Sequence, residues 1–305
     1  MSSYHSPVLL RQSTEALVRN ADGIYADCTF GGGGHSRAIL DLLSPAGRLV
    51  AFDKDSDALA NGVEDARFKL IHNNFRFIYN YSLLETAGGF DGILADLGVS
   101  SHQFDTAARG FSFRFSAPLD MRMNVQGEKS AADIVNSYTQ EELENLFKRY
   151  GELDNARRLA QLLVLARSKG PVRTTDDLNN ALADALPPFA PHKQLARIYQ
   201  ALRIGVNGEM RDLEKFLEGA ARALKPGGRL CVITYHSLED RMVKNFIRSG
   251  SVRGDVRQDA FGRNTAPLQA VNRKPAMPDE REIGTNTRAR SAKLRIAQKR
   301  EDAYE

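Results

Sequence analysis

The sequence of 305 residues lacks tryptophan and contains only two cysteines, Cys28 and Cys231. Both cysteines fall in short apolar segments that predict buried strands, so we expect reduced core residues rather than a disulfide or a metal site. No apolar stretch approaches the ~18 residues that a membrane-spanning helix needs, and the first residues lack the character of a signal peptide. These absences predict a cytoplasmic protein with no metal ligands and no membrane contact.

Neither sign of charge is in large excess, because 42 Lys and Arg face 38 Asp and Glu and give a net charge of +4. The basic residues are unevenly placed. Seven of the twenty residues from Arg281 to Arg300 are basic, and only Glu282 is acidic. Such a run is usually a solvated tail, and its sharper interpretation is a contact with an anionic partner such as RNA.

Four consecutive glycines, Gly31 to Gly34, follow the apolar segment Ile24–Cys28. A helix is expected over Arg37–Leu43, and the order strand, glycine turn, helix predicts a ligand at the helix N-terminus. About twenty residues further on, Asp53 lies where a carboxylate accepts ribose hydroxyls. The pattern indicates a cofactor that contains a nucleoside, although a glycine-rich turn alone is often only a tight connection.

NAD and S-adenosylmethionine both fit a glycine turn followed by an acid. The dinucleotide pattern GxGxxG places its third glycine inside the helix, whereas here the glycines are contiguous and His35 follows them. Asp27 precedes the turn and adds a carboxylate that suits the cationic sulfonium and amino groups of S-adenosylmethionine. These features favour the methyl donor over NAD.

Short apolar segments alternate with helical ones up to Asp96 and predict a parallel sheet with helices on both faces. Because ligands lie beyond the carboxyl ends of such strands, we expect Asp27, Asp53 and Asp96 to converge on one crevice. Phe75 follows the third strand and is a candidate to lie against an adenine ring, with core packing as the alternative. The expected strands are 24–28, 49–52, 69–72 and 90–96, and the expected helices are 13–20, 37–43, 55–66 and 75–85.

The pattern changes to helical periodicity from about residue 107 to residue 207, where Thr139 and Glu142 predict a capping box. We therefore expect a cofactor-binding domain in two parts, residues 1–106 and 208–305, with a helical domain over 107–207 inserted between the fourth and fifth strands. The segment 109–123 interleaves arginines with aromatics. That mixture suits contacts with RNA bases and phosphates, or packing at the domain junction.

After the insert, a helix is expected over 209–224, a fifth strand over 229–235 and a last strand over 291–297. His236 directly follows the fifth strand and would share a rim with Asp96. A histidine in that place is a candidate site residue.

Eight motifs occur in the order in which one family has them: DCTFGGGGHS, ADLGVSS, RGFSF, PLDMRM, QALRIGVN, LKPGGRL, YHSLEDR and TRARSAKLR. Over nearly its whole length the chain resembles the bacterial 16S ribosomal RNA (cytosine-N4)-methyltransferases, the MraW family. The resemblance implies an α/β, Rossmann-like class I fold that uses S-adenosylmethionine, with an inserted all-helical domain for substrate recognition. It implies a cytidine in the decoding region of the small subunit as substrate. It also implies cofactor contacts at Gly33, Gly34, His35, Asp53, Phe75, Asp96 and Gln103.

The catalytic hypothesis centres on Asp96, because the exocyclic N4 of cytosine is a weak nucleophile. A carboxylate that accepts an N4–H hydrogen bond would localise the nitrogen lone pair and later receive charge. His236 is the second candidate, for the base or its phosphate. Phe111, Phe113 or Tyr235 would hold a base that has left its stack.

Three rival functions share features of this sequence. An NAD-dependent dehydrogenase shares the fold and Asp53, a DNA amino-methyltransferase shares the chemistry, and a non-catalytic ribosome assembly factor would keep only the cofactor fold. The expected partner is 16S rRNA within the small ribosomal subunit. Both a monomer and a homodimer are compatible with the sequence.

Overall fold

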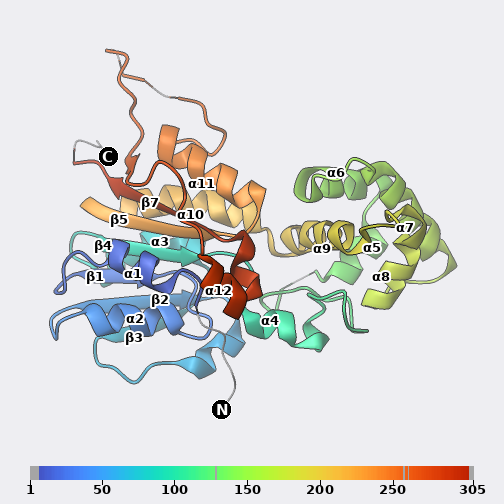
Figure 1. Ribbon diagram of the computed structural model, residues 1–305, viewed down its shortest axis with the longest axis horizontal. Helices are drawn as coiled ribbons and strands as arrows, with labels where there is room; N and C mark the ends of the chain where they lie inside the picture. Colours follow the sequence, from blue (N-terminus) through green and yellow to red (C-terminus); the bar gives the residue numbers. More distant parts are fainter. Residues whose placement is uncertain (1–6, 128, 257, 260, 302–305) are drawn as a thin grey trace. The chain divides into compact units, whose positions relative to one another are not determined.

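The computed structural model describes residues 7–127, 129–256, 258–259 and 261–301. The chain divides into two compact units (Figure 1). The sheet unit consists of Met1–Gly98 and Met210–Glu305, and the helical unit consists of Val99–Glu209. Among the described residues, no helix combines the length and the apolar character that crossing a bilayer requires.

The sheet unit contains a seven-stranded sheet in the order β3-β2-β1-β4-β5-β7-β6. β7 runs antiparallel to its neighbours β5 and β6, and the pairs among β1 to β5 are parallel. The strand order reverses between β1 and β4, which places a ligand crevice at their carboxyl ends. The strands are β1 (Ile24–Asp27), β2 (Arg48–Asp53), β3 (Phe68–His72), β4 (Phe90–Asp96), β5 (Leu224–Thr234), β6 (Leu268–Ala270) and β7 (Lys293–Lys299).

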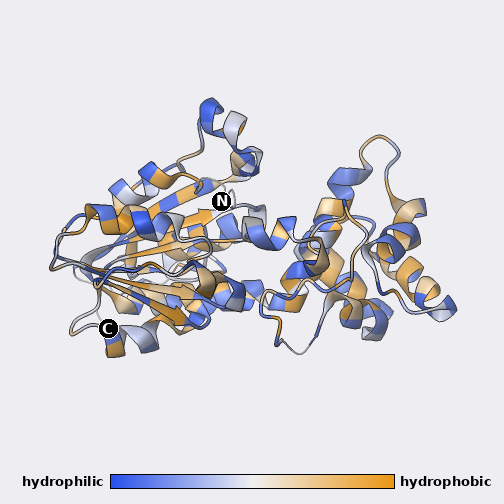
Figure 2. Ribbon diagram, turned by 90° about the horizontal axis from the view of Figure 1, so that it is seen from below, coloured by the Kyte–Doolittle hydropathy of each residue, from blue (hydrophilic) through white to orange (hydrophobic). Residues whose placement is uncertain are grey.

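Helices cover both faces of this sheet, as the predicted α/β fold requires. Leu49 of β2 packs in one apolar cluster with Ile39 of α2, whereas Phe52 packs edge-on against Tyr81 of α3. Residues an odd number apart on a strand point to opposite faces, so α2 and α3 cover different sides. The strands between them are strongly apolar (Figure 2). The helices of this unit are α1 (Leu10–Leu17), α2 (Gly34–Leu42), α3 (Ile78–Glu85), α10 (Glu209–Ala223), α11 (Ser237–Ser249) and α12 (Glu280–Thr285).

Two expectations for this unit are wrong in detail. The helix expected over 55–66 is a short 3₁₀ helix, Ser56–Asn61, which ends before Gly62 and Val63, two residues that disfavour a helix. The basic run near the end of the chain is not a solvated tail. It forms α12, a 3₁₀ turn and β7, where the buried Arg295 bonds to Asp240.

Both cysteines are buried and free, as the sequence predicts. The last strand is also present, two residues later than expected, because Ser291 still belongs to the 3₁₀ helix Thr287–Ser291. β5 begins earlier than expected, since Leu224 already pairs with Phe90 before a register shift near the Pro-Gly-Gly segment.

In its described residues, the helical unit has no regular strand and is built around one apolar cluster that includes Leu143, Phe147, Leu163 and Leu202. The predicted capping box is present: the Thr139 hydroxyl accepts from the Glu142 amide, and the Glu142 carboxylate accepts from the Thr139 amide. Its α-helices are α4 (Ser101–Asp105), α5 (Ala131–Ser137), α6 (Gln140–Gly151), α7 (Ala156–Lys169), α8 (Thr175–Leu182) and α9 (Pro191–Asn207).

Candidate active site

The glycine turn between β1 and α2 has the backbone that glycine makes possible. Gly31 and Gly33 have φ angles of 51° and 75°, in the left-handed region where other residues are strained. A Cβ atom on Gly34 would collide with Pro7 Cγ. Because α2 begins at Gly34, the first-turn amides of Gly34 and His35 have no carbonyl within their own helix to bond. They are donors suited to a ligand at the helix N-terminus.

Asp53 at the end of β2 lies beside this turn. Its Oδ2 accepts from the Gly31 amide at 2.8 Å and its Oδ1 accepts from the Asp55 amide at 2.9 Å. Burial raises the pKa of Asp53, and these two amides act against that rise. Since each carboxylate oxygen has two lone pairs, both oxygens retain capacity to accept a ribose hydroxyl.

Asp27 at the end of β1 is buried beneath the same turn. Its Oδ2 accepts from the Ser36 hydroxyl at 2.6 Å, and its Oδ1 accepts from the Thr29 amide at 3.2 Å. Burial raises its pKa, and its charge acts on both Asp53 and Asp96. The three strand-end carboxylates are therefore close enough for the charge of Asp27 to act on the other two. Asp27 also holds the glycine turn through its bonds to Thr29 and Ser36.

Asp96 at the end of β4 accepts a 2.8 Å hydrogen bond from the Tyr235 hydroxyl to its Oδ1. Its Oδ2 lies 3.8 Å from His35 Nδ1, and its side chain is 21% exposed. Burial raises the pKa of Asp96 to about 6, although His35 and the Tyr235 hydroxyl favour the charged form. The carboxyl group is thus half protonated near pH 6 and mostly charged at neutral pH.

The His35 imidazole supports the site from inside the sheet unit. The ring is buried, and its Nε2 lies 3.1 Å from the carbonyl oxygen of Val8, which can only accept. Burial lowers the pKa of His35, and the nearby Asp96 raises it. The imidazole consequently links the segment before α1 to the end of β4, while the backbone of His35 faces the helix N-terminus.

Phe75 lies in a short 3₁₀ turn, Phe75–Phe77, directly after β3. Its ring meets the ring of Phe216 edge-on, with centroids 5.1 Å apart, and it is only partly buried. Both interpretations from the sequence therefore describe part of this side chain: one part packs on α10 and another remains accessible.

His236 caps the N-terminus of α11 through a capping box with Glu239. Its Nδ1 accepts from the Glu239 amide at 3.4 Å, and its Nε2 lies 3.1 Å from Glu239 Oε1. Glu239 is buried and also accepts from the Tyr235 amide at 2.9 Å. Sequence reasoning missed Glu239, although the spacing of His236 and Glu239 is that of a capping box.

The remaining candidates lie in the helical unit. Gln103 is the third residue of α4 and forms a capping box with Ser100, where its Oε1 accepts from the Ser100 amide. Phe111 is 6% exposed within the helical core, which favours the packing alternative over contact with a flipped base. Phe113 is partly buried, stacks on His192 and meets Tyr199 edge-on.

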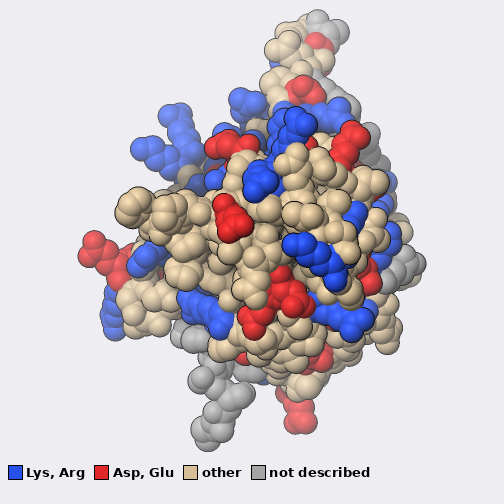
Figure 3. All heavy atoms as spheres, turned by 90° about the vertical axis from the view of Figure 1, so that its right-hand side faces the viewer, with Lys and Arg blue, Asp and Glu red and all other residues tan. Residues whose placement is uncertain are grey.

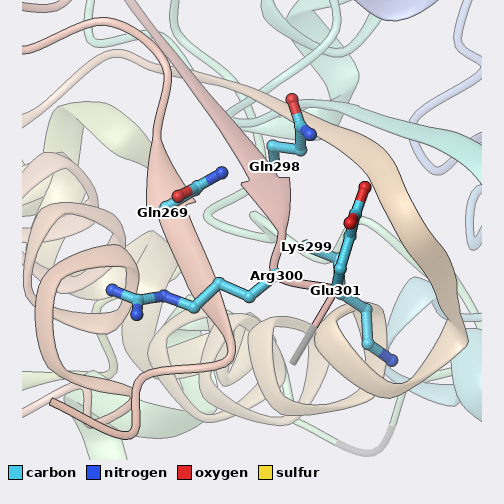
Figure 4. A pocket seen from close by; sticks show the side chains of 5 residues that line it. All are labelled: Gln269, Gln298, Lys299, Arg300 and Glu301. Atoms are coloured by element: carbon cyan, nitrogen blue, oxygen red, sulfur yellow. The ribbon is translucent and has the colours of Figure 1, made fainter. Parts of the chain in front are cut away.

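A hollow elsewhere on the sheet unit is unrelated to this site. Figure 4 shows it on the β6–β7 pair, where it is lined by Gln269, Gln298, Lys299, Arg300 and Glu301. Gln298 pairs with Arg229 in the first half of β5, so the hollow lies toward the amino ends of the parallel strands. The candidate cofactor residues of the sheet unit lie at or near the opposite, carboxyl ends.

The comparisons with known proteins agree with the motifs. The model of the MraW methylase family matches residues 2–300. A relative from Bacteroides fragilis, named ribosomal RNA small subunit methyltransferase H, is 51% identical over 299 residues, which are 98% of each chain. A relative of the same name from Flavobacterium johnsoniae is 52% identical over 296 residues, 97% of this chain and 98% of that one. Among solved structures, an rRNA methylase from Streptococcus thermophilus aligns with a TM-score of 0.39 at 13% identity, over 95% of this chain and 93% of that one.

Proposed function

The chain belongs to the MraW methylase family, and from this premise we propose that it methylates N4 of one cytidine in the decoding region of 16S rRNA. The methyltransferase class, the S-adenosylmethionine cofactor and an rRNA substrate, which the motifs predict, are confirmed by the family match and the curated relatives. The proposal adds the acceptor atom, the nucleotide and the residues that act on them.

The sheet unit offers groups that fit S-adenosylmethionine. Asp53 would hold the ribose, and Phe75 would meet the adenine. The amides of Gly34 and His35 would face the methionine part beside the backbone of Gly33, whose own amide donates to the Phe30 carbonyl. Gln103 is carried into this set by the family motif alone. When bound, S-adenosylmethionine would supply an electrophilic methyl group.

The proposal rests mainly on Asp96. Its carboxylate lies at the end of β4, is held by the Tyr235 hydroxyl at 2.8 Å and retains partial exposure. In this position Asp96 would accept a hydrogen bond from the cytosine amino group and localise the N4 lone pair. It would also stabilise the positive charge that N4 gains as it takes the methyl group from sulfur, and would then accept the proton that N4 loses. Tyr235 keeps the carboxylate oriented during that change.

The cysteines favour attack by N4 over methylation of ring carbon C5. Activating C5 requires a nucleophile to add to the neighbouring ring carbon, a task suited to a thiolate. Cys28 and Cys231 are the only cysteines of the chain and both are buried. Burial raises the pKa of Cys231 to about 12 and that of Cys28 well above its ordinary value, so neither is a ready thiolate.

We keep His236 as the second candidate, for the base or its phosphate, by its place directly after β5 and not as the acceptor of the N4 proton. Its two ring nitrogens face the Glu239 amide and the Glu239 carboxylate, so neither points away as a ready base.

The helical unit is proposed as the substrate-recognition domain, with 16S rRNA of the small ribosomal subunit as partner, which would place the reaction in the cytoplasm. Lysines, arginines and acidic side chains are interspersed on the face shown in Figure 3. A surface of this kind suits recognition of RNA by its shape and by scattered phosphate contacts. A single basic patch would suit that kind of recognition less well.

The test is transfer of labelled methyl groups to three substrates: small subunits that lack the modification, naked 16S rRNA and duplex DNA. We expect label on the small subunits. Label on DNA alone would favour a DNA amino-methyltransferase. Intact S-adenosylmethionine binding without transfer to any substrate would favour a non-catalytic assembly factor.

A further inference from the structure

Asp212 on α10 holds the two residues that flank Phe75. Asn74 Nδ2 donates to Asp212 Oδ2 at 2.6 Å, and Arg76 Nη1 donates to Asp212 Oδ1 at 3.1 Å. The Asp212 carboxylate therefore bonds to the residues on both sides of Phe75, whose ring would meet adenine. Asp212 lies 136 residues from Arg76 in the chain, so only the folded structure shows this arrangement.

The same helix supports the rest of the turn. Phe216, one helical turn after Asp212, packs edge-on against Phe75. Gly219 follows, where an added Cβ would lie 3.1 Å from Ile78, and the Arg222 guanidinium lies 3.7 Å from the centroid of the Tyr79 ring. Successive turns of α10 thus contact successive residues of the segment after β3.

Stability alone does not explain a carboxylate at position 212. Asp212 is 2% exposed, and an apolar residue in such a place often stabilises a fold as well as a buried ion pair does. The side chains that donate to Asp212, those of Asn74 and Arg76, are held in defined orientations. Asn74 also caps the turn by accepting from the Arg76 amide, and the buried Nε of Arg76 has no hydrogen-bond partner among the described residues. The Asp212 carboxylate therefore helps to fix where both side chains lie.

We propose that Asp212 is a positioning residue for the methyl donor, acting through the Asn74–Arg76 turn to place Phe75 against the adenine. The inference rests on the proposed function, in which Phe75 contacts S-adenosylmethionine. Asp212 has no role in the transfer itself, so its loss changes the affinity for the cofactor and spares the rate at saturation.

The first experiment compares Asp212→Asn with the wild type. Loss of the charged acceptor raises the KM for S-adenosylmethionine and the Kd for S-adenosylhomocysteine about tenfold, with kcat at saturating donor nearly unchanged. The matched control is Asp91→Asn, which breaks the 2.6 Å ion pair of Asp91 with Lys225 near the amino end of β4. That variant keeps the wild-type KM and Kd.

A second variant keeps the test decisive if Asp212→Asn folds poorly. Asn74→Ser retains a residue that caps the turn but shortens the side chain that reaches Asp212, and we expect weaker cofactor binding with only a small loss of thermal stability. In a Phe75→Ala background, Asp212→Asn adds no further loss of affinity, because the two changes act through one contact.

Three results would overturn the positioning role: unchanged KM and Kd in Asp212→Asn, full additivity with Phe75→Ala, or a loss of stability without a loss of affinity. Failure of the proposed function gives a different pattern. In that case the wild type transfers no methyl group to RNA, while the Kd for S-adenosylhomocysteine still rises in Asp212→Asn.

Discussion

At the scale of single residues, Asp96 links catalysis to stability. Its carboxyl group has a pKa of about 6 in the folded chain, against 3.8 for an ordinary aspartate. A folded state that holds a proton more firmly than the unfolded state loses stability as the pH rises. The stability that protonated Asp96 contributes is therefore complete below the pKa of the unfolded chain and is lost as the pH rises through about 6.

Asp96→Asn removes the carboxylate charge and with it the free-energy cost of burying that charge. We expect the variant to be more stable than the wild type at about pH 8, by about 2–3 kcal/mol at most, with the difference fading below about pH 4. Thermal denaturation at several pH values measures this. Equal melting temperatures across the range would show that the carboxylate is not raised in pKa.

The same substitution should slow methyl transfer about 100-fold, because the acceptor of the N4–H bond loses its charge. In the wild type the rate rises with pH through about 6 as the carboxylate forms, and in Asp96→Asn that rise is absent. Single-turnover rates on small subunits between about pH 5 and pH 8 report it. Full turnover with an unchanged pH profile would rule out the carboxylate role.

At the scale of elements, the site depends on the close approach of the glycine turn to the segment before α1. Gly34→Ala places a Cβ against Pro7 Cγ. We expect a loss of about 1–3 kcal/mol of stability and weaker cofactor binding, since the start of α2 has to shift. Gly88→Ala is the control, because a Cβ there meets nothing within 4 Å. Similar effects of the two substitutions would contradict this account.

The helical unit offers a second test at this scale. Thr139→Ala removes the side chain that caps α6 and should cost about 1 kcal/mol of unfolding free energy, while Thr139→Ser should retain most of it. Chemical denaturation of the full-length chain measures both variants. A Thr139→Ala variant as stable as the wild type would mean that water replaces the cap without loss.

Elements that depend on local pattern could be predicted from the sequence, and those that depend on distant partners could not. The apolar runs of β1, β2 and β4 and the Thr139 capping box are local signals. β6 has only three residues and is ordered by pairing with β7. Asp53 and Asp96 could be located because they end strands, whereas the position of Asp212 against Asn74 and Arg76 depends on tertiary packing.

At the scale of the whole molecule, the chain combines a sheet unit that fits a nucleoside cofactor with a helical unit that has its own apolar core. Each unit has a distinct task in the proposed reaction: the first holds the donor and Asp96, and the second recognises RNA. The net charge of only +4 favours recognition of a structured RNA surface over tight binding to any polyanion.

The most direct measurement is the chemical identity and position of the methylated nucleoside after reaction with unmodified small subunits, determined by digestion and mass spectrometry. The account predicts N4-methylcytidine at a single cytidine of the decoding region. C5-methylcytidine or a methylated ribose would contradict the role of Asp96, because the methyl group would then not be on the amino group that Asp96 is proposed to act on. Label scattered over many nucleotides would contradict a single target.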